Sequence, residues 1–274
     1  MELTQLNRLL PGKRAFITGG ASGLGAAFAQ LLAKNGWILH VADINREALE
    51  ATSSAWTGAA ELHLYALDVQ DNAQYQAVAR DVLATSECVD LLINNAGVGD
   101  GALFHNYEVA HWERVIAINL LGTMYGCHHF VPGMRQQQNG LVINIGSAAG
   151  FLNVPGMSAY NVSKAGVHSL SETLYHELKS SRVHVSVAMP SFFQSNVMQQ
   201  STSSAGFKKF AEKQMKYSKT NATELAGIIL QKSAQGQFRI VHPQDARRNF
   251  FLKKWFPKRV EKQFEKMMAR FKQF

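Results

Sequence analysis

Tyr160 and Lys164 stand four positions apart in the stretch Tyr-Asn-Val-Ser-Lys. On a helix this spacing places both side chains on one face. A nearby ammonium favours phenolate over phenol, so it is expected to lower the tyrosine pKa from its ordinary value of about 10. A tyrosine with a lowered pKa can act as a general acid or base. Because Tyr-x-x-x-Lys also occurs as an ordinary surface pair, a second feature is needed to support catalysis.

Ser147 supplies that second feature. It follows the near-continuous apolar run 141–145, which predicts a strand buried on both faces. Open α/β sheets bind ligands at the carboxyl ends of their strands, so Ser147 is expected at a ligand-binding edge.

A glycine-rich stretch at residues 18–25, Thr-Gly-Gly-Ala-Ser-Gly-Leu-Gly, lies between a predicted strand and a predicted helix. Such glycines let the backbone approach a pyrophosphate at the helix N-terminus, and the lack of a following Lys-Ser or Lys-Thr excludes a P-loop. Asp43 follows Gly25 by 18 residues, close to the offset of roughly 20 for a carboxylate that binds a ribose hydroxyl. The alternatives are a tight strand–helix turn at 18–25 and an N-cap role for Asp43, ahead of a helix that begins near Asn45.

Seven apolar or alternating runs predict the strands that must position these residues. They lie at residues 14–18, 37–42, 61–67, 90–93, 141–145, 183–189 and 238–241. Helical patterns separate them, the longest at about 108–134 and 158–179. This alternation predicts an α/β fold with a doubly wound parallel sheet. No linker interrupts it, so we expect one domain at residues 1–252 and a C-terminal extension at 253–274.

The composition excludes several classes of protein. A chain of 274 residues with 46% hydrophobic and 18% charged residues can bury a core, which argues against disorder. Cys88 and Cys127 are too few for a disulfide framework, and we expect reduced thiols in a cytoplasmic protein. The start of the chain does not resemble a signal peptide, and no continuous apolar stretch is long enough to span a membrane.

The ten histidines do not predict a metal site. His128 and His129 are adjacent and His105 and His111 are six residues apart, and neither pair has helical ligand spacing with a carboxylate partner. His168 and His176 fall on the predicted helix 158–179, where surface or subunit contacts are expected.

The net charge of +8 is concentrated at the C-terminus, since residues 1–199 carry −4 and residues 200–274 carry +12. After Pro257 an amphipathic basic helix is predicted, with an apolar stripe at Val260, Phe264, Met267, Met268 and Phe271. The stripe could pack on the domain or on a sister subunit, or the helix could lie on an anionic membrane surface. Nucleic acid is not expected as a partner, because no recognised reading module accompanies the charge.

Together these motifs resemble the short-chain dehydrogenases/reductases over about residues 13–200. The Thr-Gly-x-x-x-Gly-x-Gly loop of that family matches residues 18–25, and its Asn-Asn-Ala-Gly motif matches residues 94–97. Asp68-Val69 resembles the pair that holds the adenine ring. The catalytic tetrad of the family is matched by Asn119, Ser147, Tyr160 and Lys164. The chain departs from the family at Pro190-Ser191, which replaces the usual Pro-Gly ahead of Ser195 in the place of a threonine.

The resemblance implies a Rossmann-like sheet of order 3-2-1-4-5-6-7, a homodimer or homotetramer, and hydride transfer between a nicotinamide and a carbinol or carbonyl carbon. Tyr160 would exchange the hydroxyl proton, Ser147 would orient the oxygen, Lys164 would contact the ribose and lower the Tyr160 pKa, and Asn119 would hold a relay water. The expected cofactor-binding residues are Gly19, Ser22, Gly23, Leu24, Gly25, Asp43, Ile44, Asp68, Val69, Asn95, Ala96, Gly97, Tyr160, Lys164, Pro190, Phe193 and Ser195.

The expected cofactor is NAD rather than NADP. Asp43 would repel a 2′-phosphate, and neither the following Ile44 nor the loop residues Ala21 and Ser22 offer a positive charge. Arg46 is expected to face solvent on the next helix.

The substrate is expected to be a hydrophobic secondary alcohol or ketone, steroid-like, aromatic or fatty. In the family, the segments between Ser147 and Tyr160 and after Pro190 form the pocket walls, and here both are rich in apolar residues. The expected substrate contacts are Ser147, Val154, Met157, Tyr160 and Phe192. Alternatively, several of these apolar side chains, together with Met198, Phe207 and Phe210, could serve only to pack the segment after Pro190 and make no contact with the substrate. The rival function is a catalytically silent dinucleotide-sensing or adaptor protein, which the presence of Ser147, Tyr160 and Lys164 disfavours.

Overall fold

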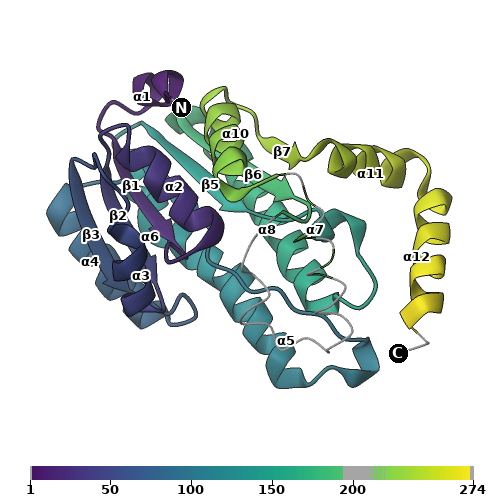
Figure 1. Cartoon of the computed structure of the whole chain (residues 1–274). Coiled ribbons are helices and arrows are strands. Elements are labelled where there is room, and N and C mark those ends of the chain that lie inside the picture. The colour runs from purple at the N-terminus through teal and green to yellow at the C-terminus, as the bar shows by residue number, and fades with distance from the viewer. Residues whose placement is uncertain are drawn as a thin grey trace.

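Seven parallel strands form the centre of the protein (Figure 1). The computed structural model describes residues 2–193, 211, 213, 215, 216, 218 and 220–271. The strands are β1 (Arg14–Thr18), β2 (Ile38–Asp43), β3 (Glu61–Ala66), β4 (Leu91–Asn94), β5 (Gly140–Ile145), β6 (Val183–Pro190) and β7 (Arg239–His242). Their order is β3-β2-β1-β4-β5-β6-β7, which confirms the predicted topology.

Helices cover both faces of this sheet (Figure 1). They are α1 (Thr4–Leu9), α2 (Gly23–Ala33), α3 (Arg46–Ser53), α4 (Asn72–Ser86), α5 (Val109–Ile116), α6 (Gly122–Gln136), α7 (Ala149–Leu152), α8 (Ser158–Glu177), α10 (Ala222–Ala234), α11 (Gln244–Trp255) and α12 (Pro257–Phe271). Apolar residues of α1, α2 and α10 share one core cluster, and those of α4 and α6 share another. Every residue of β4 and β5 is therefore buried, which explains why these strands read as continuous apolar runs.

The helix predicted at about 108–134 runs without a break from Val109 to Gln136, but its middle turn is not α-helical. A π-helical turn at Ala117–Leu121 joins α5 to α6 and carries Asn119. The Asn119 amide accepts a hydrogen bond from the Val98 N–H at 2.8 Å and donates one to the Val98 carbonyl at 3.0 Å. A 3.6-residue pattern does not reveal one extra residue in a turn, and such turns often mark functional sites.

Buried amide side chains hold the helices close to the central strands. Asn94 of β4 donates to the Asn144 side chain of β5 at 2.8 Å, and Asn144 donates to Ser171 of α8 at 3.0 Å. Helix α6 approaches β4 closely at Gly126, where an added Cβ would lie 2.0 Å from Asn94 Oδ1. This contact requires glycine on steric grounds alone.

The C-terminal helices extend away from the sheet (Figure 1). Helix α12 begins at Pro257 as predicted, whereas α11 was not predicted from the sequence. The predicted division between residues 252 and 253 falls within α11, and the two-part organisation stays a prediction. Among the described residues, no helix combines the length and apolar character needed to span a bilayer.

Substitution Gly126→Ala is expected to lower the free energy of unfolding by about 1–3 kcal/mol, because the new methyl group overpacks the contact with Asn94. A Cβ added at Gly133, on the same helix, would meet no atom of the described residues within 4 Å. As the matched control, Gly133→Ala should instead stabilise by about 0.5 kcal/mol. Urea unfolding measures both variants, and equal stability of the two would contradict the packing assignment.

Candidate active site

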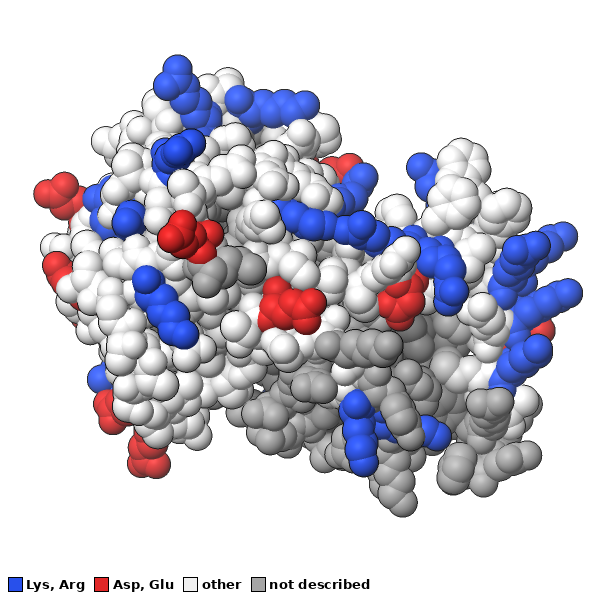
Figure 2. Space-filling model, turned by 45° about the horizontal axis from the view of Figure 1, so that its top comes forward, with Lys and Arg blue, Asp and Glu red and all other residues white. Residues whose placement is uncertain are grey.

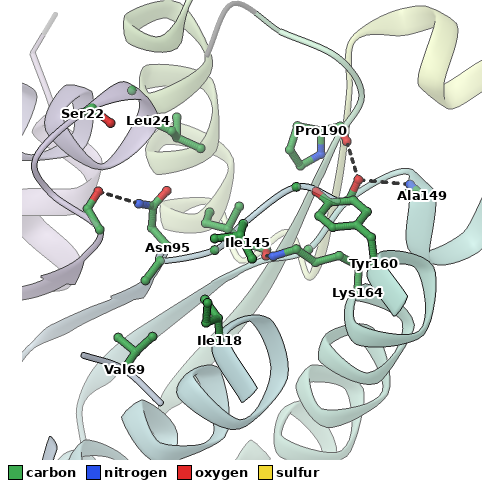
Figure 3. Close-up of a pocket in the computed structure, with 18 of the residues that line it drawn as sticks. Ser22, Leu24, Val69, Asn95, Ile118, Ile145, Ala149, Tyr160, Lys164 and Pro190 are labelled. Carbon is green, nitrogen blue, oxygen red and sulfur yellow. Dashed lines mark hydrogen bonds between the residues drawn. The ribbon is translucent and has the colours of Figure 1, made fainter. Parts of the chain in front are cut away.

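A cavity of about 500 Å³ opens at the carboxyl edge of the sheet, within the size range of small-molecule sites (Figure 3). The glycine-rich loop and Asp43 line one part of it, and Ser147, Tyr160 and Lys164 line another. The other predicted site residues that line it are Gly19, Ser22, Gly23, Leu24, Ile44, Asp68, Val69, Asn95, Ala96, Gly97, Val154, Met157, Pro190, Phe192 and Phe193. Gly25 and Asn119 do not line this cavity, and Ser195 lies outside the described residues.

The loop after β1 has the shape of an anion-binding turn. Gly19 has a φ of +70°, and a Cβ added at Gly25 would lie 2.0 Å from the Gly19 carbonyl oxygen. Gly25 thus acts by letting α2 start close to the loop. The N-cap Ser22 makes no side-chain capping hydrogen bond, so its hydroxyl does not occupy the first N–H groups of α2. These features fit a pyrophosphate.

Asp43 supports the loop and faces the cavity. Its Oδ2 accepts from the Ala21 N–H at 2.9 Å, and its Oδ1 accepts from the Asn45 N–H at 3.0 Å. The N-cap of α3 is Asn45, whose side chain accepts from the Ala48 N–H, so the alternative cap role for Asp43 is wrong. A carboxylate retains further acceptor positions after two such bonds, as a ribose contact needs. Arg46 pairs with Glu50 on α3 at 2.6 Å and does not line the cavity.

Asn95 acts on the loop as well as lining the cavity. Its side-chain amide donates to the carbonyl oxygens of Thr18 at 2.9 Å and Gly19 at 3.0 Å. The Thr18 hydroxyl in turn accepts from the Asn95 and Ala96 N–H groups, both at 3.1 Å. The end of β4 is thereby tied to the end of β1 beside the cavity. Asp68 lies two residues after the end of β3, and its side chain accepts hydrogen bonds from the Gln70 backbone N–H and side-chain amide.

Lys164 is a buried cation at the end of β5. Its Nζ donates to the Ile145 carbonyl at 2.8 Å (Figure 3). Burial lowers the pKa of Lys164 from its ordinary 10.5 to about 8. The same ammonium lies 5.9 Å from the centroid of the Tyr160 ring, and both side chains come from α8.

The pKa of Tyr160 is raised above 10 because burial disfavours the phenolate, and the nearby Ser147 hydroxyl only partly offsets this effect. The prediction that the Tyr160 pKa is lowered is therefore wrong for the protein without cofactor or substrate. Spacing along a helix predicts proximity to Lys164 but carries no information about how deeply both groups are desolvated.

Ser147 is held in place from three sides. Its hydroxyl oxygen accepts from the Ala149 N–H at 3.1 Å, and the hydroxyl lies 3.5 Å from the Pro190 carbonyl to which it donates (Figure 3). Its backbone N–H points to Nε2 of His168 at 3.4 Å. The serine side chain is thus fixed by the turn into α7 and by the end of β6.

His168 is a residue of this site that was expected at a surface or subunit contact. A Cβ added at Gly146 would lie 2.6 Å from its Nε2, and one added at Gly150 would lie 2.7 Å from its Cε1. Burial lowers its pKa to about 4, so the ring is neutral and Nε2 can accept the Ser147 N–H. Gly146 and Gly150, on either side of Ser147, were the sequence signal for this contact, because residues without a side chain leave room for the His168 ring.

Asn119 holds the segment after β4 beside Lys164. Besides its two bonds to Val98, its amide donates to the Ser163 hydroxyl at 3.2 Å. A Cβ added at Gly97 would lie 3.0 Å from Asn119 Oδ1 and 3.4 Å from Lys164 Nζ, which places this glycine between the two. The predicted relay water stays a prediction, since protein groups already engage the amide of Asn119.

Apolar side chains form the wall next to Tyr160. Met157, Ala211 and Met215 are buried together, and Val154, Tyr160 and Phe192 pack against them. The predicted apolar residues Met198, Phe207 and Phe210 lie outside the described residues.

Comparisons with known proteins place this geometry in context. The family model described as short chain dehydrogenase matches residues 13–206. A 2-dehydro-3-deoxy-L-rhamnonate dehydrogenase (NAD(+)) of Sphingomonas sp. is 37% identical over 190 residues, 69% of this chain and 75% of that protein. The 3-oxoacyl-(acyl-carrier-protein) reductase FabG of Thermotoga maritima is 34% identical over 186 residues, 68% of this chain and 76% of that protein. A short-chain dehydrogenase/reductase of Burkholderia phymatum, solved in complex with NAD, has a TM-score of 0.84 and 31% identity, covering 93% of this chain and 96% of that one.

The lowered pKa of Lys164 predicts a specific dependence of stability on pH. Between its folded pKa of about 8 and its ordinary 10.5, the unfolded chain binds the proton that the folded chain has released, so stability rises with pH. The free energy of unfolding should gain about 2 kcal/mol from this group between about pH 7.5 and about pH 10. Urea unfolding of the protein and of Lys164→Met isolates the effect. The same pH dependence in both would show that Lys164 is not desolvated as described.

Proposed function

This chain belongs to the short-chain dehydrogenase/reductase family of oxidoreductases, and we propose that it transfers hydride between NAD(H) and a hydrophobic secondary alcohol or ketone. One observation carries the proposal. A proton-transfer group, Tyr160, and an oxygen-binding group, Ser147, line the same cavity as a glycine-rich anion-binding loop and Asp43. A catalytically silent dinucleotide sensor has no need of the first two groups, so the arrangement favours an active enzyme.

The residues of the cavity fit an extended NAD molecule. The loop at Gly19 and the start of α2 would receive the pyrophosphate, and Asp43 would accept from the adenosine ribose hydroxyls. Lys164 would contact the nicotinamide ribose. The remaining proposed contacts are Ser22, Gly23, Leu24, Gly25, Ile44, Asp68, Val69, Asn95, Ala96, Gly97, Tyr160, Pro190, Phe193 and Ser195. The bound dinucleotide supplies the hydride-transfer chemistry, and the protein supplies position and electrostatics.

Tyr160 exchanges a proton with the substrate oxygen, and Ser147 orients that oxygen by a hydrogen bond. Burial keeps the Tyr160 phenol protonated at neutral pH, which is the form that donates to a carbonyl oxygen during reduction. Oxidation of an alcohol requires the phenolate instead. The Lys164 ammonium, whose Nζ lies 5.9 Å from the ring centroid, would stabilise that phenolate by its charge.

The apolar wall supports a hydrophobic substrate, steroid-like, aromatic or fatty. Val154, Met157 and Phe192 line the cavity near Tyr160 and offer no charge to a polar substrate. The names of the relatives do not indicate one substrate, since one refers to a sugar acid and the other to an acyl carrier protein. The substrate class therefore rests on the lining of this pocket.

The setting of the enzyme is also a proposal. A cytoplasmic homodimer or homotetramer suits the reduced cysteines and the family, and contact of residues 253–274 with an anionic membrane surface suits their charge.

Substitution Tyr160→Phe is expected to lower turnover by at least about a hundredfold, because the proton donor is lost while the ring is kept. Affinity for NADH should change by less than about twofold, measured by fluorescence titration. Tyr175→Phe is the matched control, since Tyr175 lies on the same helix and stacks on Phe238 away from the cavity. Full turnover in Tyr160→Phe with an apolar ketone would remove Tyr160 from the mechanism.

The carboxylate of Asp43 predicts a preference for NAD over NADP, because it would face the 2′-phosphate. Asp43→Asn keeps an oxygen for the Ala21 N–H and should raise kcat/KM with NADP by about tenfold or more, relative to NAD. Glu47→Gln removes an exposed charge from the first turn of α3 and is the control for net charge. Equal efficiency of the unaltered protein with both cofactors would contradict the role of Asp43.

A further inference from the structure

Three aromatic side chains lie exposed where α11 meets α12. Phe251, Trp255 and Phe256 have exposed fractions of 55%, 60% and 47%. The Phe251 ring centroid lies 6.4 Å from that of Trp255 and 6.3 Å from that of Phe256, so the three form one apolar surface. We call this surface the aromatic elbow. Contiguous exposed aromatic residues mark interaction sites more often than scattered ones do.

Cations surround the aromatic elbow. Lys254 Nζ lies 5.3 Å from the Trp255 ring centroid, and Arg259 Cζ lies 5.4 Å from the Phe256 ring centroid. Along α11 and α12 the sequence has nine Lys or Arg residues and three Asp or Glu residues, a net charge of +6. Figure 2 shows blue side chains projecting from this arm at the right of the view, with little red among them.

The apolar stripe of α12 is not the exposed face. Val260 is 5% exposed, and Phe264, Met267 and Met268 are half-buried. These four residues of the predicted stripe are therefore largely covered in the single chain, and the side chain of the fifth, Phe271, lies outside the part of the chain that the structure describes. The aromatic elbow, which lies at the junction with the unpredicted α11, is the apolar surface of the arm that faces solvent.

We propose that the aromatic elbow docks on the surface of an anionic phospholipid bilayer. Tryptophan and phenylalanine beside Lys and Arg suit the boundary between headgroups and acyl chains, where rings insert and cations meet phosphates. A second copy of the same arm is a poorer partner, because two surfaces of charge +6 would repel each other. Nucleic acid would satisfy the cations but gives no reason for an exposed Phe251–Trp255–Phe256 cluster next to a helical junction.

The aromatic elbow is connected to the wall of the cavity. Lys253 donates from Nζ to the Leu152 carbonyl at 2.6 Å, and the Phe250 and Phe151 rings meet edge to face at 4.7 Å between centroids. Leu152 lines the cavity. Docking through α11 would thus hold the apolar wall near the bilayer, from which a hydrophobic substrate could enter. The docking surface itself does not depend on the proposed reaction and can be tested without it.

Sedimentation with vesicles tests the proposal on the full chain. Vesicles of phosphatidylcholine with about one third phosphatidylserine should bind the protein, whereas phosphatidylcholine alone should bind it at least about tenfold less. The double variant Trp255→Ser/Phe256→Ser should lose at least about tenfold in partitioning onto anionic vesicles. Phe104→Ser is its control, because Phe104 is 76% exposed on the body of the protein and should not affect binding.

A charge-reversal pair separates the contribution of the cations. Lys254→Glu/Lys258→Glu should weaken binding to anionic vesicles by at least about tenfold, and Lys34→Glu/Arg80→Glu, equal in charge change but on the exposed body, should weaken it much less. Circular dichroism confirms that each variant is folded. Equal vesicle binding by the elbow and body variants would overturn the proposal. It would also be overturned if the elbow variants left vesicle binding unchanged and weakened only binding to single-stranded nucleic acid or self-association of the protein. Turnover of a water-soluble ketone without lipid should be unchanged by the elbow variants, so failure of docking and failure of the proposed catalysis are distinguishable.

Discussion

The buried ammonium of Lys164 is the interaction around which the site is arranged. An uncompensated charge in a protein interior is costly, and here the Ile145 carbonyl at the end of β5 accepts its hydrogen bond at 2.8 Å. That carbonyl is available because β5 ends there, and Ser147 follows two residues later. Asn119, on the π-helical turn, holds the Val98 segment, and Gly97 of that segment lies between Asn119 and Lys164. Burial in this setting lowers the pKa of Lys164 from its ordinary 10.5 to about 8.

Close backbone approach is the second constraint, and glycines meet it in two different ways. Gly19 and Gly25 let a loop and a helix N-terminus come near enough to contact a phosphate group. Gly126 and Gly146 serve packing instead, since one lets α6 approach Asn94 and the other leaves room for the His168 ring behind Ser147. The catalytic body therefore depends on close contacts between backbone segments. The basic arm formed by α11 and α12 is instead distinguished by its exposed aromatic and cationic side chains.

Most of the sheet and of the site was predictable because both rest on local patterns. Apolar runs located all seven strands to within one or two residues, and the resemblance to a known family identified many of the residues that line the cavity. The failures concern properties that spacing does not encode. The π-helical turn adds one residue to a helical period, the Tyr160 pKa depends on burial, and His168 acquires its role from two glycines distant along the chain. Helix α11 lacks a strong apolar stripe, so the aromatic elbow that it forms with α12 was not foreseen.

Ser147, Tyr160 and Lys164 are proposed to support hydride transfer rather than only dinucleotide binding. Incubation of the full chain with NADH deuterated at both C4 positions and a panel of apolar ketones, followed by mass spectrometry of the products, tests it most directly. The expected product is an alcohol that carries one deuterium on its carbinol carbon. Tight binding of the NADH with no deuterium in any product would contradict the claim and would assign the chain to dinucleotide sensing.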